Sequence, residues 1–374
     1  MIVGTLGTSG RARVDPRGAI TVSGEDWTLD WWIGADDRWR VPATEPAVRQ
    51  EAFGGVPIAE TRLRVPGGDA IQRVYGVAGR GDPVVVEIEN ASPAAFVVAF
   101  AIRGATAIAA GNTEVSLDGR VALVVPFAPR RWDVTDIDLT AEQCGAQTGL
   151  LPPTTLGTGA LRAALLYPLS HRNRLRIVVV TGDERPHVDL AQLPDPNQVV
   201  KGWYRQLERG MRVRGVEDRM AAIDLARTQV LLDPDPGAAT AAALEDWGFD
   251  DEAEWAWHGL SWRERRAARR RAVPDDSPGG MLLAARADYV RELEDGIELL
   301  CGPVVPGVDL EVYDAPTRHG SISFALRWHG ERPALLWERT GEWPAVEIRV
   351  PGLAPGWSST DAVGETLLPT TLVG

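Results

Sequence analysis

Cysteine and lysine are almost absent from this chain of 374 residues, and each absence narrows its chemistry. Cys144 and Cys301 are its two cysteines, and they lie far apart without a CxxC pair. Neither a zinc site nor a disulfide framework is indicated, so we expect no metal and no cofactor. Lys201 is the only lysine among 39 basic residues, and we interpret the excess of arginine as a genome-wide bias.

Long hydrophobic runs are missing as well. No apolar stretch reaches the ~18 residues that a membrane-spanning helix needs. The chain does not start with a basic stretch followed by an apolar one, as a secretory signal would. These absences predict a cytoplasmic protein with no membrane partner. The HExxH, GxSxG, Walker and Rossmann glycine patterns are also missing, which disfavours the chemistries that they serve.

Positive charge is in deficit, with a net charge of −13 that disfavours nonspecific binding to nucleic acid. Residues 262–271 nevertheless form an arginine-rich run that could contact phosphates. No aromatic residues alternate with these arginines, and the solvated face of a helix explains them equally well. We therefore expect no nucleic-acid partner.

The chain is long enough for two or three domains, and its first 195 residues show β-type patterns. Short apolar runs recur between turn signals, which is typical of a large antiparallel β-sandwich. The predicted strands are 19–22, 27–33, 61–65, 71–77, 84–89, 96–102, 121–125 and 175–180.

The only long helix-like stretch is 203–295, within a predicted helical segment at 196–296. Apolar residues recur at helical spacing, the 233–237 stretch with its prolines ends one helix, and Gly248 ends the next. Asp250 is expected to cap the helix that follows. The stripes that predict the first and last helices are Ala222, Ile223, Ala226 and Val230, and Leu282, Ala285, Tyr289 and Leu293.

Residues 297–374 predict a small C-terminal β-domain. Within 321–328, Ile322, Phe324, Leu326 and Trp328 alternate with more polar residues, as one face of a strand would. The tail after Pro351 is rich in glycine, proline, serine and threonine, and we expect coil there. The fold class is therefore α+β and multidomain.

Three short stretches of the sequence resemble parts of a known protein family. Residues 203–212 look like a linker entering a first barrel helix. Residues 244–253 look like a barrel turn at which one helix ends at glycine and an acidic helix begins, and 296–324 look like a barrel exit into a closing β-domain. The order of a β-sandwich, a helical segment and a small β-domain, together with these three stretches, resembles the six-hairpin glycosidases. These are (α/α)6-barrel enzymes of the glucoamylase and glycogen-debranching type.

The chain departs from that family in length. Twelve helices of ~12 residues with short connections need about 200 residues, whereas the helical stretch holds 93. A closed barrel cannot form from one copy of this segment, so we expect a partial, strongly shortened barrel. Because the family's acid and base lie in barrel loops, this shortening predicts a noncatalytic relative.

If a catalytic pair exists, our candidates are Asp250 and Glu254, with Trp255 and Trp257 as platforms for a sugar. Glycoside hydrolysis requires two carboxyls facing each other across the scissile bond. The alternative is that the acidic residues at 250–252 complement a helix dipole and the others solvate its surface. His258 could act as a base, although a histidine at a helix end more often caps it.

A second candidate site is the densest aromatic and acidic cluster, at 27–39. Indole faces stack on sugar C–H surfaces, and carboxylates accept hydrogen bonds from hydroxyls. Alternation places Trp27 and Trp31 on one face of a strand and Trp32 on the other, so one face is core and the other can bind a ligand. We name Trp32, Asp36, Asp37 and Trp39 as the candidate binding residues, with core packing as the alternative.

Three classes of function remain open. The first is a noncatalytic carbohydrate-binding or accessory protein. The second is a glycoside hydrolase with acid and base carboxylates at the junction of sandwich and helices. The third is an assembly component, in which helix faces left open by the partial barrel bind a protein partner or a second copy of the chain.

Overall fold

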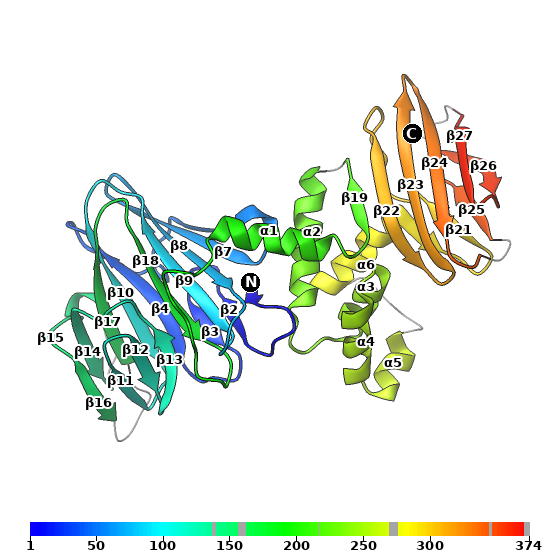
Figure 1. The fold of residues 1–374 in the computed structure, drawn as a ribbon. Helices are drawn as coiled ribbons and strands as arrows, with labels where there is room; N and C mark the ends of the chain where they lie inside the picture. Colours follow the sequence, from blue (N-terminus) through cyan, green and yellow to red (C-terminus); the bar gives the residue numbers. More distant parts are fainter. Residues whose placement is uncertain (137–139, 156–161, 216, 269–275, 344–345, 370–374) are drawn as a thin grey trace. The chain divides into compact units, whose positions relative to one another are not determined.

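A computed structural model describes residues 1–136, 140–155, 162–215, 217–268, 276–343 and 346–369 (Figure 1). The chain divides into two compact units, Met1–Val200 and Lys201–Gly374. The border falls within helix α1 (Pro196–Leu207). The sequence predicts separate helical and C-terminal β-domains, whereas the structure groups these two parts in the second unit.

The first unit is a β-sandwich of two antiparallel sheets, as its alternating apolar runs predict. In spatial order, the first sheet contains β1 (Ile2–Gly4), β2 (Arg11–Val14), β3 (Ile20–Val22), β4 (Thr28–Gly34), β10 (Phe96–Arg103), β17 (Arg162–Leu169), β14 (Arg131–Thr135) and β15 (Gln147–Thr148), and β5 (Trp39–Arg40) pairs with β4.

In the described residues, the second sheet has nine strands, as the first sheet does. In spatial order they are β16 (Leu151–Thr155), β11 (Ala107–Ala110), β12 (Glu114–Leu117), β13 (Arg120–Val124), β18 (Arg174–Val180), β9 (Pro83–Asn90), β8 (Gly68–Gly76), β7 (Ile58–Val65) and β6 (Val48–Ala52). Two short 3-10 turns, Phe53–Gly55 and Ala141–Gln143, also belong to this unit.

The core of the sandwich is built from the inward faces of both sheets. Trp31 on β4 lies opposite Phe100 on β10, and both are fully buried. Because side chains alternate along a strand, this inward set follows directly from the apolar pattern of the sequence.

A row of alternating charges crosses the second sheet on the face away from this core. Glu60, Arg73, Glu87 and Arg176 lie opposite one another on β7, β8, β9 and β18. Arg73 Nε donates to Glu60 Oε2 at 2.5 Å, and Arg176 Nε donates to Glu87 Oε2 at 2.7 Å. The Glu60 and Glu87 side chains are fully buried, so this charge row compensates their charges inside the fold.

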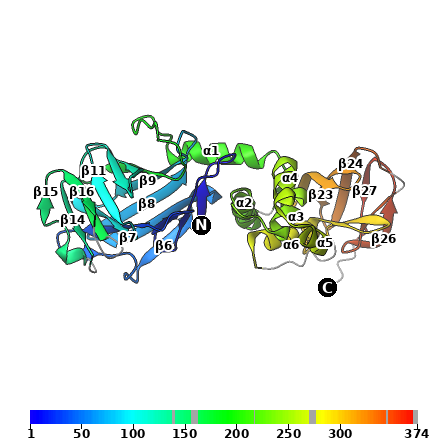
Figure 2. The same cartoon turned by 90° about the horizontal axis from the view of Figure 1, so that it is seen from below.

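The second unit begins with helices that lie beside its sheets (Figure 2). They are α2 (Glu217–Leu231), α3 (Ala238–Asp246), α4 (Asp250–Gly259), α5 (Trp262–Ala268) and α6 (Pro278–Tyr289). The predicted stripe holds for Ile223, Ala226 and Val230, which are buried, but Ala222 is exposed. Leu293 is not in the last helix, because the chain enters strand β20 (Val290–Glu292) directly after Tyr289.

Two sheets complete the second unit. The third sheet has the order β19 (Arg212–Arg214), β22 (Leu310–Thr317), β23 (Gly320–His329), β24 (Arg332–Thr340) and β27 (Val363–Leu367). The fourth has the order β20 (Val290–Glu292), β21 (Gly296–Leu299), β25 (Glu347–Val350) and β26 (Ala354–Ser359).

The prediction of coil after Pro351 was wrong. Strands β26 and β27 lie in this tail and pair with β25 and β24, respectively. Both lie at sheet edges, where glycine and proline are tolerated because one side of the strand needs no partner. Pairing with a preformed neighbour therefore overrides the weak strand propensity of this segment.

Candidate functional site

The aromatic cluster at 27–39 is mostly interior. Trp27 and Trp31 belong to the main core, and Trp32 has 2% of its surface exposed. Trp32 packs in a second apolar cluster with Ala99 and Ala164, and its Nε1 donates to Asp30 Oδ2 at 3.3 Å. The expectation that Trp32 faces a ligand is therefore not met, because both faces of β4 are covered.

The other three candidates of this cluster reach solvent. Asp36 and Asp37 are exposed, and Trp39 is half-buried. Arg40 donates two hydrogen bonds to Asp37, at 2.7 and 2.6 Å, and this pairing lowers the pKa of Asp37 to about 2. Trp39 packs against Gly34 of the neighbouring strand and against the second apolar cluster. Trp39 is the one tryptophan of this stretch that is not buried, and it lies near the exposed Asp36 and Asp37 in the sequence.

The turn from α3 to α4 differs in detail from its prediction. Gly248 adopts the left-handed conformation, with φ of 79°, as a helix C-terminus requires. Phe249, not Asp250, is the N-cap residue of α4, and it has no side-chain cap. Asp250 is the first residue of the helix, where its negative charge suits the helix dipole.

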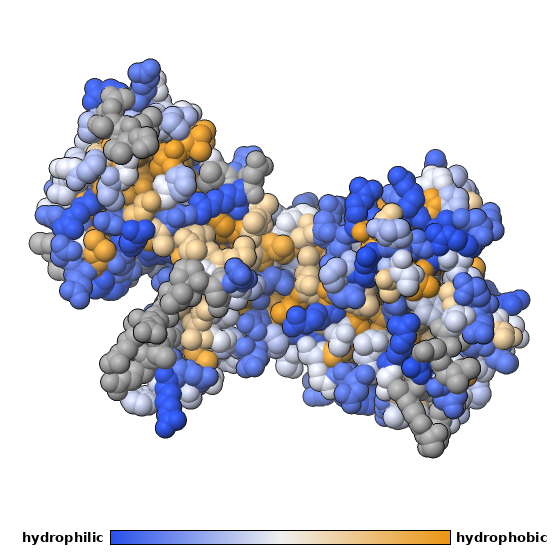
Figure 3. All heavy atoms as spheres, turned by 180° about the vertical axis from the view of Figure 1, so that it is seen from behind, coloured by the Kyte–Doolittle hydropathy of each residue, from blue (hydrophilic) through white to orange (hydrophobic). Residues whose placement is uncertain are grey.

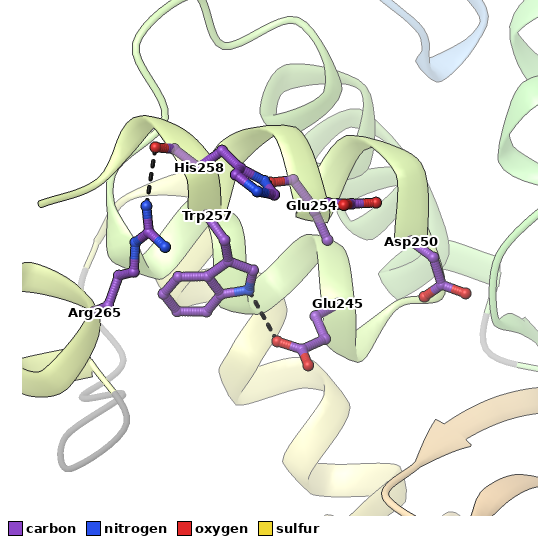
Figure 4. A pocket seen from close by; sticks show the side chains of 7 residues that line it. Glu245, Asp250, Glu254, Trp257, His258 and Arg265 are labelled. Atoms are coloured by element: carbon purple, nitrogen blue, oxygen red, sulfur yellow. Dashed lines mark hydrogen bonds between the residues drawn. The ribbon is translucent and has the colours of Figure 1, made fainter. Parts of the chain in front are cut away.

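A depression of about 620 Å³ opens along α4, and its lining includes several of the predicted residues (Figure 4). Asp250, Glu254, Trp257 and His258 come from α4, Glu245 comes from the end of α3, and Arg265 comes from α5. We call it the α4 depression.

Hydrogen bonds fix the wall of the α4 depression. Trp257 Nε1 donates to Glu245 Oε2 at 2.9 Å, and Figure 4 shows the indole between Glu245 and Arg265. Arg265 donates to the His258 carbonyl at 3.0 Å, and His258 Nδ1 lies 2.8 Å from the Glu254 carbonyl. His258 thus bonds to its own helix. A fixed, half-buried indole beside carboxylates is suited to stacking on a sugar ring.

Trp255 lies outside this lining, although it is on the same helix. Its side chain is 60% exposed, against half-burial for Trp257. The predicted pair of platforms is therefore separated, and Trp257 is the one that the structure places with Asp250 and Glu254.

A second depression, of about 690 Å³, has Glu245 and Asp250 in its lining as well. It reaches from the end of α3 to the turn between β22 and β23, and we call it the hairpin depression. Its walls include Asp246 of α3 and the hydroxyl-bearing residues Thr317, Ser321 and Thr340. Because Glu245 and Asp250 line both, the two depressions adjoin, and we call them together the acidic groove.

Asp246, one of several carboxyls that the helical segment offers, was not among the two predicted catalytic residues, and it lines the hairpin depression. Burial raises the pKa of its carboxyl, an effect that the positive charge of Arg286 partly offsets. Arg286 is 4% exposed, and its guanidinium donates to the carbonyls of Val290 and Pro316. Burial thus favours the neutral form of this carboxyl more than exposure to water would.

One local signal in the sequence distinguishes Asp246 from the other carboxyls of the helical segment. It follows Glu245 in the last turn of α3, where the helix dipole disfavours negative charge. Thr317 and Ser321 gave no comparable signal, because only the turn from β22 to β23 brings them near the helices.

Metal sites, membrane-spanning helices and the arginine-rich run are the other features that could indicate a function. Among the described residues, no group of three or more His, Cys, Asp or Glu side chains is placed to hold a metal ion. No helix in the described ranges is long and apolar enough to cross a membrane. In the arginine-rich run, Arg269, Arg270 and Arg271 lie outside the described residues.

No protein-family model matches the chain, and no curated protein matches it.

Proposed function

We propose that this protein binds carbohydrate in the acidic groove and is a noncatalytic or accessory relative of the six-hairpin glycosidases. The observation that carries the proposal is Trp257, an indole held by Glu245 in a depression that Asp250 and Glu254 also line. An aromatic ring covers the apolar face of a sugar, and adjacent carboxylates accept hydrogen bonds from its hydroxyls.

The resemblance to the family stays part of this proposal. It is supported by the order of parts, a β-sandwich followed by helices and smaller sheets, and by the glycine-ended turn between α3 and α4. A partial barrel explains why so few helices follow the sandwich.

The test is calorimetric titration of the purified protein with glucose, maltotriose and cellotriose. We expect Trp257→Ala to weaken binding roughly tenfold or more, because the aromatic face supplies about 1.5–3 kcal/mol of apolar burial. Trp255→Ala is the matched control, since Trp255 lies on the same helix outside the groove lining. Loss of binding in Trp255→Ala with retention in Trp257→Ala would refute the assignment.

Asp246 favours the second candidate function, a glycoside hydrolase. A carboxyl with a raised pKa is what a general acid requires, and Glu245 and Asp250 lie in the same depression. This version of the site lies in the second unit, between helices and the β22–β23 turn.

Exposed apolar side chains favour the third candidate, an assembly role. Trp255 is 60% exposed and Trp262 on α5 is 69% exposed. Figure 3, seen from behind, shows apolar atoms among polar ones at the surface. Analytical ultracentrifugation tests this role, since a monomer at high concentration would argue against self-assembly.

A further inference from the structure

We infer that the hairpin depression is a second sugar subsite, so that the ligand of the acidic groove is an extended oligosaccharide and not a single sugar. This inference rests on the proposed function, because it assigns a chain length to the ligand of that same site.

Continuity of the groove is the first step. Glu245 and Asp250 line both depressions, so the two adjoin at these carboxylates, and we assign the sugar that follows the one stacked on Trp257 to the hairpin depression. The hairpin depression is at least as roomy as the α4 depression, with volumes of about 690 and about 620 Å³.

Hydroxyl chemistry on the far wall is the second step. Ser321 Oγ and Thr340 Oγ1 are 2.6 Å apart on neighbouring strands, and Thr317 Oγ1 donates to the Gly320 carbonyl at 3.0 Å. A hydroxyl offers one donor and two acceptor sites, so these groups keep capacity for a ligand after their mutual bonds. Asp246 and Asp250 add acceptors from the helical side.

Charge pairing argues against an anionic ligand. Two arginines line the hairpin depression, and both are engaged: Arg209 pairs with Glu252, and Arg318 pairs with Glu292 at 3.0 Å. The hairpin depression therefore presents carboxylates and hydroxyls, and both arginines of its described lining are paired with carboxylates, which suits a neutral polyhydroxylated chain and not a phosphate or a uronate.

The backbone also shapes this wall. Gly320 has φ of 134°, and a Cβ at this position would lie 2.0 Å from the Thr340 carbonyl. Glycine therefore lets the β22–β23 turn lie close against β24, which brings Ser321 and Thr340 together at the wall.

The experiment measures affinity against chain length by calorimetry, using mono- to tetrasaccharides of the malto and cello series. We expect the trisaccharide of one series to bind at least tenfold more tightly than its monosaccharide. In Ser321→Ala we expect that gain to shrink severalfold while the monosaccharide affinity stays unchanged.

Asp246→Asn provides a second variant on the opposite wall, with the same expected pattern. Ser358→Ala, at an exposed position of β26 outside the groove, is the control and should keep the full gain. Circular dichroism melts establish that each variant is folded.

The outcomes separate the two proposals. If no sugar of any length binds, the proposed function itself fails. If sugars bind through Trp257 with affinity independent of length, or if the gain survives in both Ser321→Ala and Asp246→Asn, the second subsite is refuted and the proposed function stands.

Discussion

The indole Nε1 of Trp257 donates a hydrogen bond of 2.9 Å to Oε2 of Glu245, which ties α4 to the end of α3. The same carboxylate lines both depressions of the acidic groove. The bond therefore orients the ring and places an acceptor beside it.

Changing Glu245 tests this relationship. Glu245→Ala should weaken sugar binding severalfold, because the ring loses a bond of about 0.5–1.5 kcal/mol and gains freedom that binding must then remove. Glu245→Gln keeps an acceptor oxygen and should bind nearly as well as the native protein. Equal titration curves for Glu245→Ala and the native protein would show that the bond does not organise the site.

Arg73 is expected to be a major contributor to the stability of the sandwich. Arg73→Ala leaves the fully buried Glu60 and Glu87 without its charge and should cost about 3–5 kcal/mol in the free energy of unfolding. Arg64→Ala, which removes an exposed pair with Asp69, should cost about 0–1 kcal/mol. Urea denaturation measures both, and similar costs for the two variants would contradict a structural role of the charge row.

Trp32 should behave as a core residue and not as a ligand contact. Its truncation in Trp32→Ala should destabilise the first unit by about 3–5 kcal/mol, because it empties a packed site. Trp32→Phe should cost less and leave sugar affinity unchanged. A folded Trp32→Phe protein with weakened sugar binding would instead restore the surface site at 27–39.

The sandwich could be predicted from the sequence because its strands alternate around turn signals. Leu29, Trp31 and Ile33 follow the period of two, and all three lie in the core. The same reasoning failed for Trp32, because the prediction assumed that one face of the sheet is exposed to solvent. Nothing in the local sequence says that a second apolar cluster covers the other face of β4.

The candidate site was only partly predictable for a related reason. Asp250, Glu254 and Trp257 are close in the sequence and share one helix, so local spacing brought them together. The wall made by Thr317 and Ser321 depends on long-range pairing between β22 and β23, which no local pattern encodes. The same dependence on pairing explains why β26 and β27 were missed.

Stability should respond to pH through Asp246. Burial raises the pKa of this carboxyl above its ordinary value of 3.8, so the folded state binds its proton more tightly than the unfolded state. The stabilisation of the folded state by the protonated Asp246 carboxyl is present below pH 3.8. It is lost as the pH rises through the pKa that Asp246 has in the folded state.

Asp246→Asn removes this titration, and comparing the two proteins cancels the similarly raised Asp30 and Asp224. We expect the native protein to lose stability relative to Asp246→Asn as the pH rises above about 4. Urea unfolding from pH 4 to pH 7 measures the difference, and a difference that does not change with pH would contradict the assignment.

We expect this chain alone not to hydrolyse glycosides efficiently. Hydrolysis needs an acid with a raised pKa and a second carboxylate held rigidly opposite, in a site that limits water. Asp250 and Glu254 are both exposed on α4. Asp246 has the raised pKa, but it lines the hairpin depression and not the α4 depression that Glu254 lines.

The measurement is a screen of the purified protein against aryl α- and β-glycosides and natural oligosaccharides. The expected result is binding without turnover. Turnover that disappears in Asp246→Asn, Asp250→Asn or Glu254→Gln, with circular dichroism showing an intact fold, would make the protein an enzyme. The residue whose loss abolishes activity would then decide between the two depressions, since Asp246 lines only the hairpin depression and Glu254 only the α4 depression among the described residues.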